Sequence, residues 1–169
     1  MKYQKPLTTV EILGIAIQSE IESARYYQSL KHIIRSPALK DKLGFLVTEE
    51  QKHRRILMDY YNRKFPDINL SRPPVSALPR PAIPRRGTVR VSALLKIALE
   101  AEESAENFYL TMARDVNDIQ GAILLRYLAR VEDGHYHLLK NELDLMEQSA
   151  KLKELKALYQ SDEAVHLGP

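Results

Sequence analysis

The chain of 169 residues contains no cysteine. Disulfides, thiol catalysis and every iron centre held by cysteine thiolates are therefore excluded, including rubredoxin-type iron and iron–sulfur clusters. Any metal site must instead be built from glutamate, aspartate and histidine side chains.

Long hydrophobic runs are also lacking, because charged residues interrupt each apolar stretch within a few positions. No segment resembles a signal peptide or a membrane span, so we expect a cytoplasmic protein that does not interact with membranes. The net charge of +3 is too small to favour nucleic-acid binding. The length and the 44% of hydrophobic residues suit one globular domain, which we expect to comprise residues 1–169.

Apolar residues recur with a period near 3.6 in two pairs of segments, which predicts an all-α fold. The first helix pair is expected within residues 8–62 and the second within residues 91–147. Thr8 or Thr9 can cap the first helix, and Ser36 and Pro37 separate the first two helices. The tail, residues 148–169, is amphipathic and either extends the fourth helix or folds back as a short fifth helix.

A connector between the helix pairs, residues 63–90, has a different composition. It holds six of the nine prolines and is rich in arginine. This density of proline excludes a helix or a central strand. We expect an extended, partly polyproline segment whose arginines are solvated.

An internal repeat relates the two helix pairs. A shift of 82 residues pairs Leu13 with Leu95, Ala16 with Ala98, Glu20 with Glu102, Tyr27 with Tyr109, Leu43 with Leu125, Leu46 with Leu128, Glu50 with Glu132, His53 with His135, and Leu57 with Leu139. The repeat thus preserves glutamate, histidine and tyrosine in register with the apolar positions.

These polar residues lie on the apolar stripes of their helices. The second helix has the spacing 4, 3, 4, 3, 4 through Leu39, Leu43, Leu46, Glu50, His53 and Leu57. The fourth helix repeats that spacing through Gly121, Leu125, Leu128, Glu132, His135 and Leu139. Glu20 and Glu102 likewise lie on stripes of the first and third helices. Four carboxylates and two imidazoles are therefore predicted to face one interior.

Four buried carboxylates need compensating charge, because each unpaired one costs several kcal/mol. Two divalent cations carry +4, which matches four carboxylates with neutral histidines. Hard oxygen ligands with one imidazole per metal suit iron or manganese. Surface helices with misassigned stripes are the alternative, but every element of the pattern recurs at one offset. The predicted metal ligands are Glu20, Glu50, His53, Glu102, Glu132 and His135.

In this order the motifs resemble the ferritin-like di-iron carboxylate proteins, and among them the rubrerythrin branch. The resemblance covers roughly residues 8–147. It implies an antiparallel four-helix bundle with a long crossover between the second and third helices. By resemblance, Glu50 and Glu132 bridge two iron ions, Glu20 and Glu102 are terminal ligands, and His53 and His135 each bind one iron. It also implies that Tyr27 and Tyr109 lie near the site and form hydrogen bonds with ligand carboxylates.

The chain departs from the rubrerythrins in two respects. It lacks the four cysteines of their rubredoxin domain, so its electrons must come from a separate redox partner. Rubrerythrins also carry an extra carboxylate on the third helix, but Ala105 stands three residues after Glu102. Glu106, one turn after Glu102, is an alternative seventh ligand or hydrogen-bond acceptor, unless it tilts outward to an arginine or to water.

The expected function is that of a non-haem di-iron protein that reduces hydrogen peroxide or dioxygen. The alternatives are a ferroxidase or iron-handling protein, a manganese catalase-like enzyme, a bundle that binds metal only for stability, and an interaction protein that uses the basic connector. We expect a homodimer or a higher oligomer. The connector either closes one bundle or allows two chains to exchange helix pairs.

Overall fold

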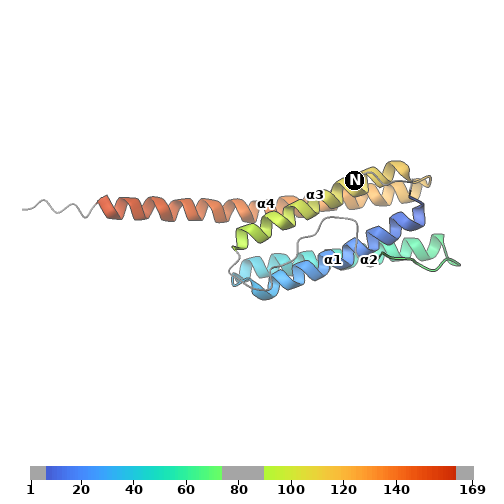
Figure 1. Ribbon diagram of the computed structural model, residues 1–169, viewed down its shortest axis with the longest axis horizontal. Coiled ribbons are helices and arrows are strands. Elements are labelled where there is room, and N and C mark those ends of the chain that lie inside the picture. Colours follow the sequence, from blue (N-terminus) through green and yellow to red (C-terminus); the bar gives the residue numbers. More distant parts are fainter. Residues whose placement is uncertain (1–6, 74–89, 163–169) are drawn as a thin grey trace, which may run out of the picture.

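The computed structural model describes residues 7–73 and 90–162, and Figure 1 shows its four helices. They are α1 (Thr9–Ile33), α2 (Pro37–Lys64), α3 (Val91–Asp115) and α4 (Ile119–Asp162). None of the helices in these two ranges combines the length and the apolarity that a membrane span requires. The predicted all-α fold is confirmed.

Local sequence signals set the starts of the first two helices. Thr8 and Glu11 form a reciprocal capping box, in which each side chain accepts a hydrogen bond from the backbone of the other residue. Ser36 caps α2 through its side chain, and Pro37 occupies the first turn, where no backbone N–H is needed. These caps leave only a short link between α1 and α2, so the two helices pack as an antiparallel pair.

The four helices are arranged as two antiparallel pairs. The backbone of α1 lies along α2 and that of α3 lies along α4. Among the described helices, the backbones of the two pairs approach each other only between α2 and α4 and between α1 and α3. In Figure 1, α2 ends at the opposite end of the bundle from the start of α3. The two helix ends that the predicted crossover joins therefore lie at opposite ends of the bundle. Residues 74–89, which hold most of the predicted connector, lie outside the described residues.

The beginning of the crossover passes against α1. The Tyr61 hydroxyl donates a hydrogen bond of 3.0 Å to the carbonyl oxygen of Ile68. A methyl group at Gly14 would overlap the carbonyl oxygen of Ser71. Glycine at position 14 therefore permits the chain after α2 to lie close to the backbone of α1.

Two apolar clusters fill the bundle and lie on either side of its polar middle. The first includes Ile12, Leu13, Ile17, Leu57, Tyr61, Phe108, Met112, Leu125 and Leu128. The second includes Leu30, Leu39, Leu43, Leu46, Leu94, Leu95, Leu139 and Leu143. On each helix, the predicted ligands fall between the residues of one cluster and those of the other, so apolar side chains close the polar middle at both ends.

The fourth helix is much longer than the others. It has 44 residues, against 25 in α3, which correspond to about 66 Å and about 38 Å. Figure 1 shows α4 continuing well past the start of α3. Of the two alternatives for the tail, the structure has the extension of the fourth helix, up to Asp162. Leu152 and Leu155 of this extension are exposed, as is Leu145 just before it.

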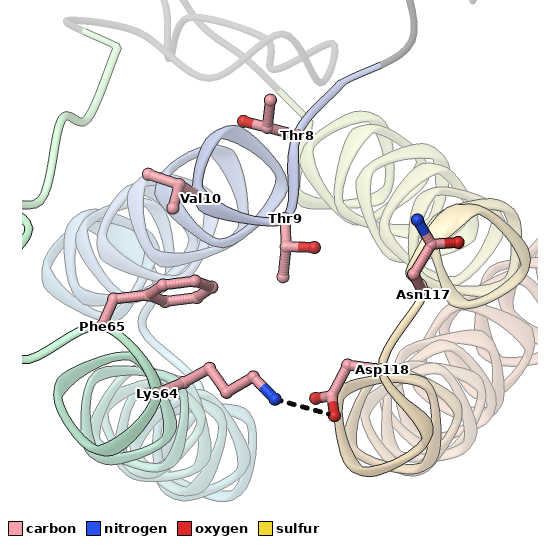
Figure 2. Close-up of a pocket in the computed structure, with 7 residues that line it drawn as sticks. All are labelled: Thr8, Thr9, Val10, Lys64, Phe65, Asn117 and Asp118. Atoms are coloured by element: carbon pink, nitrogen blue, oxygen red, sulfur yellow. Dashed lines mark hydrogen bonds and ion pairs between the residues drawn. The ribbon is translucent and has the colours of Figure 1, made fainter.

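Asp118 joins the two helix pairs at one end of the bundle. Its carboxylate accepts hydrogen bonds from the Tyr60 hydroxyl, from the backbone N–H of Gly121 at 3.0 Å and from Lys64 Nζ at 3.1 Å. Beside it is a pocket of about 390 Å³, drawn in Figure 2. The pocket is lined by Thr8, Thr9, Val10, Lys64, Phe65, Asn117 and Asp118, and thus by residues other than the predicted ligands.

Candidate metal centre

All six predicted ligands lie in the interior, in the middle of the bundle. None is more than 3% exposed, although every one is polar or charged. Glu20 comes from α1 and Glu102 from α3, while α2 and α4 each contribute a glutamate and, one turn later, a histidine. The structure thus brings together residues from both halves of the repeat.

The ligand-type atoms gather into two overlapping groups. One consists of Glu20, Glu50, His53 and Glu132, and the other of Glu50, Glu102, Glu132 and His135. In each group the atoms lie within 4.8 Å of one another, close enough for one metal ion to contact all of them. Glu50 and Glu132 belong to both groups, which is the disposition of carboxylates that bridge two metals.

The distances show how these two glutamates divide their oxygens. Glu50 presents Oε2 to His53 Nδ1 at 3.6 Å and Oε1 to His135 Nδ1 at 3.5 Å. Glu132 presents Oε1 to His53 Nδ1 at 3.4 Å and Oε2 to His135 Nδ1 at 3.0 Å. Each carboxylate therefore offers one oxygen to each half of the site.

The remaining two glutamates each belong to one half. Glu20 Oε2 lies 3.3 Å from His53 Nδ1, and Glu102 Oε2 lies 3.8 Å from His135 Nδ1. The Nδ1 atoms of both histidines thus face the carboxylates. The two imidazole rings are stacked, with centroids 5.5 Å apart.

Several buried polar atoms of this centre have no hydrogen-bond partner. They are Glu20 Oε2, Glu50 Oε1, Glu132 Oε1, both ring nitrogens of His53, and Nε2 of His135. A buried polar atom without a partner is destabilising, and native structures hold few of them. Carboxylate oxygen and imidazole nitrogen are also ligand atoms that bind iron and manganese. The residues present therefore fit a pair of metal ions.

Protons balance the charge of the centre when it holds no metal. Burial lowers the pKa of His53, but the carboxylates of Glu132, Glu20 and Glu50 oppose this and raise it to about 12. Burial also lowers the pKa of His135, but the neighbouring carboxylates of Glu102, Glu132 and Glu50 outweigh it and leave the pKa raised. Both imidazoles are then positively charged at neutral pH.

The four glutamates divide into two kinds. Burial and the charge of Glu50 raise the pKa of Glu20 to about 7. Burial and the charge of Glu132 raise the pKa of Glu102 well above its ordinary value. Burial also raises the pKa values of Glu50 and Glu132, but the neighbouring histidines leave both lowered. Two charged carboxylates thus face two charged imidazoles, and the other two carboxyl groups tend to hold protons.

Tyr27 and Tyr109 contact the centre, and they do so across the bundle. The hydroxyl of Tyr27 in α1 donates to Glu102 Oε1 in α3, and the hydroxyl of Tyr109 in α3 donates to Glu20 Oε1 in α1. Both tyrosines are buried. Each half of the repeat therefore positions the terminal glutamate of the other half.

Glu106 and Glu49 are less deeply placed. Glu106 is partly exposed and, among the described residues, belongs to neither group of candidate ligands. Its role as a seventh ligand stays a prediction.

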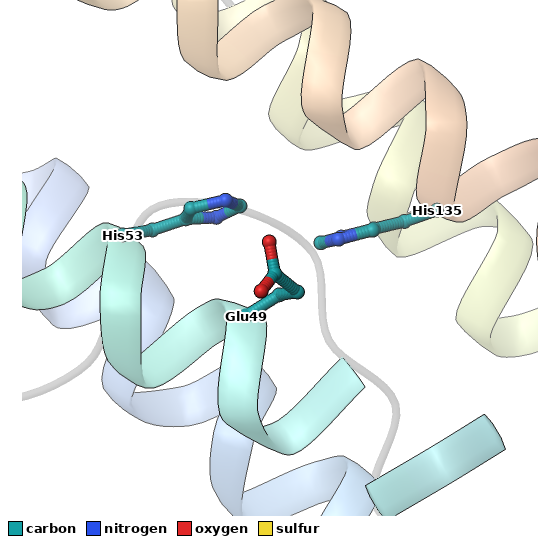
Figure 3. A group of neighbouring side chains, drawn as sticks. All are labelled: Glu49, His53 and His135. Carbon is teal, nitrogen blue, oxygen red and sulfur yellow. The ribbon is translucent and has the colours of Figure 1, made fainter. Parts of the chain in front are cut away.

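Glu49 was not identified from the sequence pattern, yet its carboxylate lies within 4.8 Å of a ring nitrogen of His53 and of His135. Figure 3 shows it between the two rings. Its position four residues before His53 places it one helical turn away, a signal that could have indicated it.

Comparisons with known proteins agree with this architecture. The sequence model of the family described as Rubrerythrin matches residues 11–143, and an overlapping match covers residues 93–161. The hypothetical protein Pfu-1136390-001 from Pyrococcus furiosus is 34% identical, with a TM-score of 0.74 over 82% of this chain and 90% of that chain. No curated protein matches the chain.

A second solved structure shares the fold at lower identity. It is a dodecameric thioferritin, the bacterioferritin-related protein from Bacteroides fragilis, with 17% identity and a TM-score of 0.69 over 86% of this chain and 88% of that chain. The Rubrerythrin match includes all six buried residues of the candidate centre and most of the chain. The resemblance seen in the motifs is thereby confirmed, and the chain belongs to the rubrerythrin family.

Proposed function

We propose that the protein binds two iron ions in the middle of the bundle and reduces hydrogen peroxide, or dioxygen, with electrons from a separate redox partner. One observation carries this proposal. Two buried groups of ligand-type atoms share Glu50 and Glu132, so that two metals would lie side by side between the same two carboxylates.

The six residues divide naturally between the two metal positions. Glu20 and His53 would hold one ion, Glu102 and His135 the other, and Glu50 with Glu132 would bridge them. Two iron ions held together supply two electrons to an O–O bond, and manganese is the alternative metal for these ligands. Four carboxylates against two divalent cations leave the loaded centre without net charge when the histidines are neutral.

Residues around the centre exclude water from it and orient its carboxylates. The two apolar clusters exclude water from both sides, which strengthens the electrostatic interactions of the carboxylates. The hydroxyl groups of Tyr27 and Tyr109 hold one oxygen of each terminal glutamate and leave the other free to bind metal. Glu20 Oε2, the oxygen on the side of His53, has no other partner.

Electrons have to arrive from outside the chain. The sequence has no cysteine and hence no thiolate-bound iron centre that could relay them. We therefore propose that an external donor supplies the electrons. We also propose that the protein is cytoplasmic.

We further propose that the protein forms a homodimer or a larger oligomer. The last part of α4 exposes Leu145, Leu152 and Leu155, which recur at helical spacing on one face. An exposed apolar stripe of this kind is typical of a surface that packs on another chain. The Bacteroides fragilis relative is described as dodecameric, which supports self-association of this fold.

Adjacent glutamates of α3 provide a matched test of the metal centre. Glu102 is buried in the centre and Glu103 is exposed. Anaerobic titration with Fe(II) should give two ions per chain in the wild type and in Glu103→Ala, and fewer in Glu102→Ala. Two ions bound by Glu102→Ala would refute the ligand assignment.

The reaction is tested on the loaded wild-type protein. The diferrous protein should consume about one equivalent of peroxide and then stop until a reductant is added, since each peroxide takes two electrons. Continuous release of dioxygen from peroxide without a reductant would instead support the manganese catalase-like alternative. Iron oxidation by dioxygen that deposits many ions per chain would support the ferroxidase alternative.

A further inference from the structure

Glu49 lies at the outer side of the two histidines and has no counterpart in the second half of the chain. The shift of 82 residues that pairs Glu50 with Glu132 pairs Glu49 with Val131. Its side chain is 18% exposed, and its Oε2 lies 3.3 Å from Lys52 Nζ. Glu49 therefore stands between the solvent and the buried centre.

Each histidine needs a hydrogen-bond acceptor for its second ring nitrogen, and the six predicted ligands do not provide one. Nδ1 of each ring faces the buried carboxylates, so the metal-binding nitrogen is Nδ1. An imidazole that binds metal through Nδ1 keeps a proton on Nε2. Nε2 of His53 and Nε2 of His135 are both buried and without a hydrogen-bond partner. Such N–H groups of metal-binding histidines almost always donate to a carboxylate, a carbonyl or a water.

Glu49 is placed to meet this requirement for both rings. One of its carboxylate oxygens and a nitrogen of each ring all lie within 4.8 Å of one another, and Figure 3 shows the carboxylate between the two imidazoles. A separation of this size can be bridged by one water molecule or closed by a change of side-chain rotamer. The equivalent position in the second half is Val131, which has no carboxylate.

We propose that Glu49 accepts hydrogen bonds from the Nε2–H groups of His53 and His135, directly or through water, and so positions both metal-binding histidines with a single carboxylate. Glu49 is a positioning residue in this arrangement. It fixes the tautomer and the orientation of both rings, and it links the two metal positions on the side that faces solvent. The inference rests on the proposed metal centre, but not on its reaction with peroxide.

Co(II) binding tests this proposal without using the catalytic reaction. The variants are Glu49→Ala and Glu49→Gln, and the matched control is Lys52→Ala, which removes the surface ion pair but keeps Glu49. Loss of the shared acceptor in Glu49→Ala should weaken Co(II) binding at least about tenfold, and loss of the charge and of one acceptor oxygen in Glu49→Gln should weaken it in the same direction. It should also affect both metal positions, because both rings lose their partner.

Proton NMR of the Co(II)-loaded protein gives a readout that a merely structural role would not change. Two exchangeable, paramagnetically shifted imidazole N–H signals are expected in the wild type. Both should exchange faster with solvent in Glu49→Ala and Glu49→Gln and remain unchanged in Lys52→Ala.

The possible failures can be told apart. Unchanged Co(II) affinity and unchanged N–H signals in both Glu49 variants, with two Co(II) ions bound by the wild type, would overturn the role of Glu49 alone. Equal losses in Lys52→Ala would overturn it as well, because the surface ion pair would then be responsible. A wild-type protein that binds no Co(II) would overturn both the metal centre and this inference.

Discussion

At the scale of single residues, the centre depends on contacts between the halves that spacing alone does not show. Tyr27 lies on the same stripe as Glu20, but its hydroxyl donates to Glu102 in the other half. Tyr109 likewise donates to Glu20. The stripe predicts that a side chain faces the interior, whereas its partner depends on how the two helix pairs dock.

The crossed hydrogen bonds predict site-selective effects of tyrosine substitution. Tyr27→Phe should keep the fold and both metals, because little volume changes. It should lower the unfolding free energy of the metal-free protein by about 1 kcal/mol through the lost hydrogen bond. Mössbauer spectra of the iron-loaded variant should change for the iron beside Glu102 only, and Tyr109→Phe should change the other iron.

The rates of reaction with peroxide should also change in these variants, since the freed glutamate oxygen can reorient. If the Tyr27→Phe, Tyr109→Phe double variant has wild-type spectra and peroxide kinetics, both tyrosines act only as core residues.

The proton balance of the centre predicts that metal binding weakens as the pH falls. His53, with a pKa of about 12, and His135 and Glu102, with raised pKa values, hold protons at neutral pH. Glu20, with a pKa of about 7, is half protonated there. Each of these protons must leave when metal binds. Calorimetric titration with Co(II) in buffers of different ionisation enthalpy should therefore show net proton release, and more from Glu20 at pH 6 than at pH 8.

Proton uptake on binding, or an affinity that does not depend on pH between 6 and 8, would contradict this charge assignment. Glu103→Gln is a suitable control, because that exposed residue should not affect the number of protons released.

At the scale of helices, regular patterns could be predicted and isolated features could not. The four inward glutamates were predictable because each lies on an apolar stripe and recurs after 82 residues. Glu49 lies one position off its stripe and its counterpart is Val131, so the repeat does not reveal it. The start of α2 was readable from Ser36 and Pro37, whereas the length of α4 was not, because an amphipathic tail is compatible with either a continuous or a folded-back helix.

The extension of α4 predicts that self-association depends on its leucines. A Leu152→Lys, Leu155→Lys double variant should have a lower molar mass in solution than the wild type, since two charges would replace two exposed apolar side chains. Light scattering after size-exclusion chromatography measures this. Both residues lie beyond the metal centre, so Fe(II) stoichiometry should stay at two per chain.

Exposed Lys151 and Lys153 supply the control, because Lys151→Ala, Lys153→Ala changes the same segment outside the leucine stripe. An unchanged molar mass in the leucine variant would show that the extension does not hold the oligomer together.

At the scale of the whole molecule, the two helix pairs are joined through their polar middle and through the apolar clusters on either side of it. The backbones of the pairs approach each other at few places. The buried carboxylates and histidines of the centre come from both pairs, as do the tyrosine hydrogen bonds. Metal that binds only the folded centre should therefore stabilise the whole bundle.

Removal of metal should accordingly lower the melting temperature. This decrease should be larger than the decrease in melting temperature that Glu103→Ala causes in the loaded protein. In Glu50→Ala, the loaded and metal-free samples should have nearly the same melting temperature, because Glu50 belongs to both groups of candidate ligands. Differential scanning calorimetry of the loaded and metal-free wild type, of loaded Glu103→Ala, and of loaded and metal-free Glu50→Ala checks this. Equal melting temperatures with and without metal would show that the centre contributes nothing to holding the pairs together.

The internal repeat has a consequence for how the chain is organised. Each helix pair carries two of the four buried glutamates, one of the two histidines and one of the two tyrosines. Each pair therefore supplies half of the candidate centre. The terminal glutamate of each pair receives its tyrosine hydroxyl from the opposite pair. One polypeptide therefore reproduces what a symmetric homodimer of helical hairpins would contain, with a crossover in place of two separate termini. It follows that the halves are free to diverge, as Glu49 and Val131 show, so the fused arrangement can make the two positions of the proposed metal centre chemically distinct where a true homodimer could not.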